Sequence, residues 1–142
     1  MKDNKAILTS ILKTSQMGQV GIRSVLETSM RPGLRKALES QLREYGDIES
    51  QASAIASQRG WELKDLDPAL RFMADRMTRL KLVRKNSDSR IADMMIQGNT
   101  QGMIKGLRDI HQFCGSDCQI NTLSQKLLDC ETANIRQMQG YL

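Results

Sequence analysis

Aromatic residues and proline are scarce in this chain of 142 residues. It has one tryptophan, two tyrosines, two phenylalanines and two prolines, and no run of β-branched residues. Strands are normally rich in aromatic and β-branched residues, whereas this chain is rich in leucine, isoleucine and methionine. We therefore expect an all-α protein.

Long apolar runs are also missing. No segment approaches the ~20 apolar residues that a membrane-spanning helix needs. Residues 1–15 have neither the sustained apolar core nor the small-residue cleavage site of a signal peptide. The cysteine count is odd, and three thiols in a chain without a signal peptide are expected to stay reduced. We expect a cytoplasmic protein without a membrane span; the roles of Cys114, Cys118 and Cys130 stay open.

Length and charge set further bounds. A chain of this length is expected to form one domain, residues 1–142, with a substantial core. The net charge of +5, from 21 basic and 16 acidic residues, favours acidic partners only modestly.

The stretch from Asp88 to Phe113 has the clearest helical pattern. Its apolar residues recur at the spacing of one helical face, and the pattern fails only at Asn99. The apolar positions are Ala92, Ile96, Met103, Leu107 and Ile110, and the row of glycines is Gly98, Gly102 and Gly106. Such a row permits close helix packing, at a cost of ~1 kcal/mol per glycine relative to alanine. We predict that this helix is the centre of a bundle.

Four other helices are predicted around it. They cover about 3–29, 32–59, 67–85 and the C-terminal segment that follows Asp117 and ends near Leu142. Each has an apolar face at helical spacing, which includes Tyr45 in the second helix and Leu142 in the last. Pro32 suits the first turn of the second helix, and Gly60 suits a left-handed cap at its end, with Trp61 folding back onto the bundle. Residues 62–66 are expected to be a polar connector. Short connections within each pair require antiparallel neighbours.

The four longest predicted helices share a polar midpoint and a weak internal repeat. Residues 19–23 (QVGIR) are similar to 101–105 (QGMIK), and both second helices carry a glutamate followed three positions later by an acid or amide. The prediction is an antiparallel four-helix bundle of two helical hairpins, joined by an additional short crossover helix.

Two hairpins, a crossover and these midpoint motifs resemble the ferritin-like superfamily over nearly the whole chain. LRKALESQL at 34–42 and QRGW at 58–61 are similar to spore-coat F-type proteins of that superfamily. The resemblance implies a metal-ligand-poor branch, because both motif histidines are missing and both first-helix glutamates are replaced by amides. The positions that match the family's ligands are Gln19, Glu44, Asp47, Gln101 (or Asn99), Glu131 and Asn134. Three carboxylates neutralise two divalent ions poorly, so we expect no metal and no cofactor, and expect the polar groups to hydrogen-bond one another.

Two other site hypotheses are weaker. His111, Cys114 and Cys118 have residue types of a zinc site, but Cys130 would have to supply the fourth ligand from roughly 18 Å along the helix. The predicted third helix carries a basic face, including Arg76, Arg79, Arg84 and Lys85, without interleaved aromatic residues; this argues against nucleic-acid binding.

These observations favour a non-catalytic structural or protein-interaction bundle, in a sporulation or spore-coat setting through the resemblance. The alternative is a degenerate ferritin-like protein that binds two iron or manganese ions. Long bundles with flat faces often dimerise, so we expect self-association as a homodimer, or a protein partner.

Overall fold

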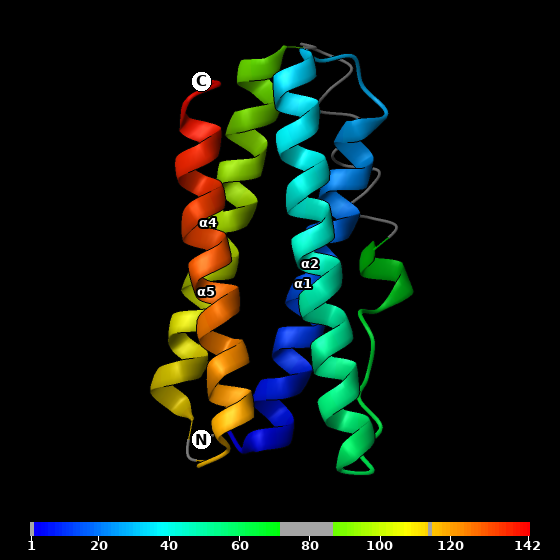
Figure 1. The fold of residues 1–142 in the computed structure, drawn as a ribbon, viewed down its shortest axis with the longest axis vertical. Helices are drawn as coiled ribbons and strands as arrows, with labels where there is room; N and C mark the ends of the chain where they lie inside the picture. The colour runs from blue at the N-terminus through cyan, green and yellow to red at the C-terminus, as the bar shows by residue number, and fades with distance from the viewer. Residues whose placement is uncertain (1, 72–86, 114) are drawn as a thin grey trace.

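The computed structural model describes residues 2–71, 87–113 and 115–142. These residues form four long helices, α1 (Asn4–Leu26), α2 (Pro32–Gln58), α4 (Asp88–Gln112) and α5 (Cys118–Gln139), and contain no strand (Figure 1). The all-α prediction is confirmed. None of the described helices is long and apolar enough to cross a membrane.

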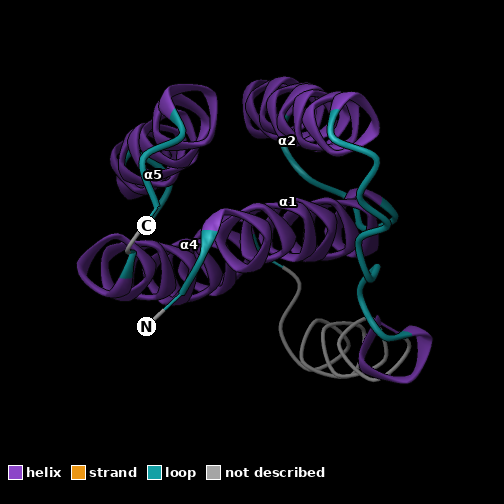
Figure 2. Ribbon diagram, turned by 90° about the horizontal axis from the view of Figure 1, so that it is seen from below, coloured by secondary structure: helices purple, strands orange, loops and turns teal. Residues whose placement is uncertain are grey.

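The helices pack as two antiparallel hairpins, α1 with α2 and α4 with α5 (Figure 1). Seen end-on, α1 lies beside α4, and α2 lies beside α5 (Figure 2). The predicted crossover helix begins as expected, because the Asp67 carboxylate accepts a hydrogen bond from the Ala69 amide at 2.9 Å and helix continues to Arg71. The remainder of that helix, with its predicted basic face, lies outside the described residues.

The helix ends follow local sequence signals. The side chains of Asp3, Ser87 and Asp117 cap the N-termini of α1, α4 and α5. Gly60 has φ of 68°, and the Trp61 amide donates back to the Ala56 carbonyl at 2.9 Å. This closes α2 with the left-handed cap that its sequence predicts, and Trp61 packs partly buried against the core.

The predicted apolar faces of α1 and α2 are buried almost throughout, and α4 shows the main discrepancy. Leu107 and Ile110 are 40% and 38% exposed, so the predicted apolar face of α4 is wrong in its second half. Gly102 and Gly106 face α5 there instead, while Asp109 is buried against α1. The small residues bring α4 close to α5 and turn the larger apolar side chains outward.

α4 is also not the centre of the bundle. Only four of its residues are buried, whereas α1 buries eleven and packs against the three other helices. A further difference lies at the C-terminus, where Leu142, predicted to be part of the apolar face, is 63% exposed. It lies beyond the end of α5.

The connector after α2 is not merely polar. Leu66 is buried, and its amide donates to Gln16 Oε1 at 2.8 Å. Gln16 Nε2 donates to Glu49 and to Asp65, each at 2.9 Å. One glutamine of α1 therefore ties α2 to the connector, and uses all its hydrogen-bonding groups to do so.

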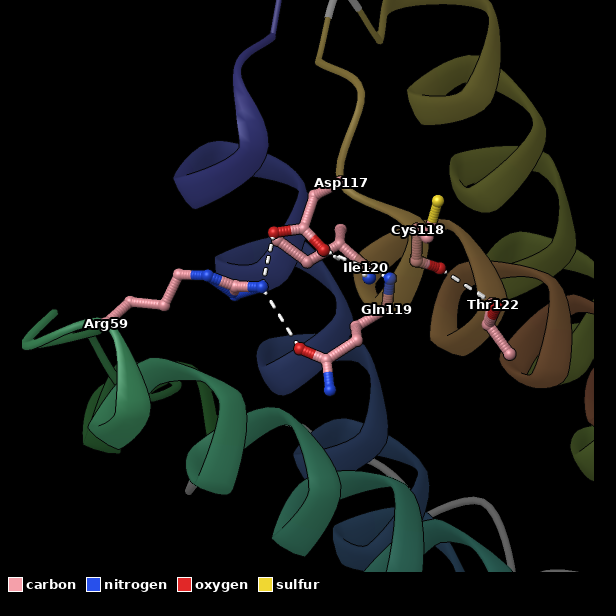
Figure 3. Close-up of polar contacts among 6 residues, drawn as sticks. All are labelled: Arg59, Asp117, Cys118, Gln119, Ile120 and Thr122. Atoms are coloured by element: carbon pink, nitrogen blue, oxygen red, sulfur yellow. Dashed lines mark hydrogen bonds and ion pairs between the residues drawn. The ribbon is translucent and has the colours of Figure 1, made fainter.

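An arginine–aspartate pair joins the hairpins at each end of α2. At one end, Arg59 pairs with Asp117 at 2.6 Å and donates to Gln119 at 3.1 Å, as Figure 3 shows. At the other end, Arg31 pairs with Asp88 in the first turn of α4. Each aspartate lies at a helix N-terminus, where the helix dipole also favours a negative charge.

Candidate functional site

Polar side chains from three helices meet in the middle of the bundle. This mid-bundle polar layer consists of Tyr45 on α2, Asn99 on α4, and Glu131 and Asn134 on α5, with exposures of 2%, 7%, 2% and 3%. Burying polar groups so completely is costly unless they find partners. The mid-bundle polar layer is therefore the strongest candidate for a functional centre inside the bundle.

Two glycines make room for this layer. A Cβ atom on Gly18 of α1 would lie 2.8 Å from the Tyr45 ring, and one on Gly102 of α4 would lie 2.8 Å from Glu131 Oε1. Any larger residue at these two positions would have to displace the layer. All four helices thus contribute to the geometry of the layer.

The hydrogen bonds of the layer are incomplete. The Tyr45 hydroxyl donates to Asn99 Oδ1 at 2.8 Å, and Asn134 Nδ2 donates weakly to the Cys130 sulfur at 3.6 Å. Asn99 Nδ2 and Glu131 Oε2 are buried without a hydrogen-bond partner within the described part of the chain. Leaving a buried polar group unpaired costs about 1–3 kcal/mol, so the layer is a strained part of the core.

Burial controls the ionisation of the layer. It raises the pKa of Glu131 from 4.5 to about 7, against a smaller lowering effect of the neighbouring Tyr45 hydroxyl. The pKa of Tyr45 is raised well above 10, first by burial and then by the charge of Glu131. Glu131 is therefore the one group of the layer that titrates near neutral pH.

The Cys130 thiol borders the layer and faces outward to α2. It donates to Glu44 Oε2 at 3.1 Å. Its pKa is raised above the ordinary thiol value, first by burial and then by Glu44. Such a thiol stays protonated at neutral pH and is a poor nucleophile.

The six residues that match the family's metal ligands do not converge on one point. Glu131 and Asn134 lie in the mid-bundle layer, whereas Glu44, Asp47 and Gln101 are exposed. Asp47 pairs with Lys126 of α5 at 2.8 Å on the outer surface. Within the described ranges, no three histidine, cysteine or acidic side chains are grouped so that they could hold a metal ion.

Gln19, the remaining member of that set, is buried next to a different partner. Its Nε2 atom donates to Glu49 Oε1 at 2.8 Å, so it belongs with Gln16 in the contact between α1 and α2. Glu49 lies five positions after Glu44, beyond the predicted Glu-x-x-Asp motif. Sequence comparison of the two halves could not have found it, because the second half has no acid at the equivalent place.

The zinc hypothesis concerns the chain reversal between α4 and α5. Cys114 lies outside the described residues, and His111 and Cys118 are both exposed. Cys118 is the first residue of α5 and its carbonyl accepts from Thr122 (Figure 3). The buried Cys130 lies three turns further along α5, on the side facing Glu44.

Two functional features were missed by sequence reasoning. The sequence pattern places Tyr45 on the apolar face of α2, but its hydroxyl donates to Asn99 and so joins the polar layer. Asp109 was not singled out, yet it is 5% exposed and accepts hydrogen bonds from Ser10 and, at 2.6 Å, from Lys2. Asp109 comes three positions after Gly106, on the helix face of the glycine row, and this spacing is the signal that could have marked it.

Comparison with known proteins gives one informative match. No family model matches this chain, and no curated protein matches it. Among solved structures, the fold is similar to the crystal structure of a DUF305 fragment from Deinococcus radiodurans, with a TM-score of 0.73. The two sequences are 14% identical, and the match covers 96% of this chain and 93% of that chain. At this identity the similarity establishes a shared all-helical bundle fold and no shared activity, and neither a ferritin-like nor a spore-coat family is shown.

Proposed function

We propose that this protein is a non-catalytic interaction bundle that forms a homodimer through the outer face of α4. The observation that carries the proposal is an exposed row of Ile104, Leu107 and Ile110, hereafter the α4 apolar row, with exposures of 42%, 40% and 38%. Three of the six large apolar side chains that the described residues expose are in this row. Such concentration on one helix is typical of contact surfaces.

The spacing of the row supports a second copy of the chain as its occupant. The three residues are separated by equal steps of three, so the row is symmetric about Leu107. A two-fold axis at Leu107 would place each Ile104 opposite the Ile110 of the second copy. A surface that is complementary to itself in this way fits a homodimer better than an unrelated partner.

The interior supports a non-catalytic role. The polar layer lies among four helices, and its acid, Glu131, is 2% exposed, so it does not present a reactive group to a substrate in this conformation. Two clefts lined by described residues lie outside the layer, one between α2 and α5 and one beside the start of α1. The outer surface, and not the polar layer, is thus what solvent and partners can reach.

Light scattering after size-exclusion chromatography tests the dimer. The expected result is a dimeric wild-type protein and a monomeric Leu107→Glu variant that remains helical. Leu142→Glu is the matched control, because Leu142 is 63% exposed and lies at the opposite end of α5 from that part of α4, so this variant should remain dimeric (Figure 1). A monomeric wild-type protein, or a dimeric Leu107→Glu variant, would refute the proposal.

The alternative is a degenerate ferritin-like protein that binds two iron or manganese ions. Glu131 Oε2 favours it, since a buried carboxylate oxygen without a partner could serve as a ligand. Metal analysis of protein purified from cells grown in manganese- and iron-supplemented medium tests it. Near-stoichiometric metal that disappears in both Glu44→Ala and Glu131→Ala would establish this alternative, and metal content unchanged by the two substitutions would eliminate it.

We further propose a ferritin-like arrangement for the bundle and a sporulation setting for the protein. The antiparallel hairpins and the side-by-side pairs α1–α4 and α2–α5 support the arrangement (Figure 2). Sequence similarity at 34–42 and 58–61 supports the setting. Detection of the protein in vegetative cells but not in purified spores of the source organism would contradict the latter.

A further inference from the structure

A basic cleft lies beside the start of α1, apart from the α4 apolar row and the mid-bundle layer. Its walls come from the first half of α1, the connector after α2, and Lys105 of α4, and its volume is about 520 Å³. A volume of this size is in the range of small-molecule sites. The lysine cleft is defined by the cations that line it, Lys2, Lys5, Lys13, Lys64 and Lys105.

The carboxylates in and next to the lysine cleft do not neutralise it. Asp3 and Glu62 line the cleft with two negative charges against five positive ones, and the Asp3 carboxylate also caps α1 by accepting from the Ala6 amide at 2.8 Å. The nearby Asp109 is buried and holds Lys2 and Ser10. In the part of the chain that the structure describes, the other four lysines of the cleft make no ion pair.

The lysines are close enough to act on one another. The pKa of Lys105 is lowered first by loss of hydration; the charge of Asp109 opposes this shift, and the smaller effects of Lys2 and Lys13 add to it. The five lysines outnumber the three carboxylates in and next to the cleft, and this excess of positive charge raises the free energy of the empty cleft. A bound anion would remove this repulsion.

The residue types indicate the kind of anion. All five cations are lysines, which bind phosphate as point charges, and the lining contains no arginine fork for a flat carboxylate. The two hydroxyls of the lining are already engaged, Thr9 with the Lys5 carbonyl and Ser10 with Asp109. Recognition by several point charges suits a ligand with several negative charges in a small volume.

We propose that the lysine cleft binds a small, soluble compound that carries several phosphate groups, such as inorganic tripolyphosphate or a nucleoside triphosphate. The cleft supplies charge and volume for the phosphates, and its two hydroxyls already donate to other groups of the protein. The role is therefore binding, and ligand occupancy would stabilise the junction of α1, α4 and the connector.

Calorimetric titration with tripolyphosphate tests the proposal. Wild-type protein is expected to bind, and Lys13→Ala/Lys105→Ala is expected to bind about a hundredfold more weakly, about tenfold for each lysine removed. The matched control is Lys36→Ala/Lys126→Ala, which removes the same net charge from residues outside the cleft, and it should keep wild-type affinity. Tripolyphosphate should also raise the melting temperature of wild-type protein, and not that of the cleft variant.

Several outcomes would overturn this proposal. One is a wild-type protein that does not bind tripolyphosphate. Another is a cleft variant that binds it as tightly as the control variant does. Retention on phosphatidic acid vesicles without binding of free tripolyphosphate would assign the cleft to a lipid headgroup instead. Binding of an oligonucleotide alone would assign it to nucleic acid. None of these measurements depends on dimer formation, so a failed dimer test and a failed phosphate test remain distinguishable.

Discussion

Carboxylates in the middle of this bundle and at its ends are held in opposite ways. Glu131, in the middle, is buried with no cation of the described residues acting on it, and burial raises its pKa to about 7. Asp88, at one end, accepts from Arg31, and this hydrogen bond lowers the pKa of the aspartate. The same chemical group therefore opposes folding in the middle when ionised and supports it at the end. The ends join the two hairpins, and the middle makes their packing sensitive to pH.

The largest expected effect comes from neutralising Glu131. Its pKa is about 7 when folded and 4.5 as a free group, so the folded protein binds the proton more tightly. The resulting stability is complete below pH 4.5 and is lost as pH rises through 7. The difference of about 2.5 between the two pKa values corresponds to a loss of roughly 3 kcal/mol by about pH 8. Glu131→Gln should remove this pH dependence.

Urea unfolding followed by circular dichroism at several pH values measures this effect. Glu39→Gln, which neutralises an exposed carboxylate of α2, is the control and should keep the wild-type profile. A wild-type protein as stable at about pH 8 as at about pH 5 would show that Glu131 titrates normally, and the contrast between middle and ends would be lost.

A smaller effect separates two glycines one turn apart on α4. A Cβ on Gly102 would press on Glu131, whereas a Cβ on Gly98 would meet nothing within 4 Å. Gly98→Ala should stabilise the protein by up to about 1 kcal/mol through helix propensity. Gly102→Ala gains the same propensity but must move a buried carboxylate, so we expect a net loss of about 1–2 kcal/mol. Thermal melts in which Gly98→Ala raises the melting temperature and Gly102→Ala lowers it would confirm the difference, and shifts in the same direction would contradict it.

The smallest effect concerns the ends themselves. The Arg59 side chain is 27% exposed and its partner Asp117 is 12% exposed, while the Arg31 side chain is 70% exposed. Arg59→Ala should therefore cost about 1 kcal/mol, and Arg31→Ala should cost less. Added salt should lower the free energy of unfolding of the wild-type protein by more than it lowers that of Arg59→Ala, as urea unfolding would measure. If Arg31→Ala were the more destabilising substitution, the exposure argument would be wrong.

Helix positions were predictable because their signals are local. Pro32, Gly60, Ser87 and Asp117 mark helix ends through backbone geometry and side-chain caps, and each does so in the structure. The apolar faces of α1 and α2 were predictable for the same reason, since a large continuous face has only one way to be buried.

The orientation of α4 was not predictable, because it depends on partners distant in sequence. Its second half offers two faces, the apolar row and the face with Gly102, Gly106 and Asp109. The second face is buried because Glu131 and Leu128 of α5 fit against the glycines and Ser10 of α1 meets the aspartate. A pattern of hydrophobicity favours the first face, and only tertiary contacts select the second.

The polar layer was predicted in part. Glu131 and Asn134 were identified through the internal repeat, and both are buried in it. Glu44 and Asp47 match the same motif but point to the outer surface, where Lys126 pairs with Asp47. A motif repeated in sequence need not have the same burial in both halves, because the rotation of each helix about its axis is set by its own core residues.

The Arg59 pair has a practical consequence for spectroscopy. Trp61, the only tryptophan of the chain, lies 5.7 Å from the Arg59 guanidinium, measured to the ring centroid, and is partly buried. Its fluorescence therefore reports on the α2–α5 end of the molecule, whereas the helical signal reports on the whole. An emission shift that precedes the loss of ellipticity would reveal fraying of that end before global unfolding.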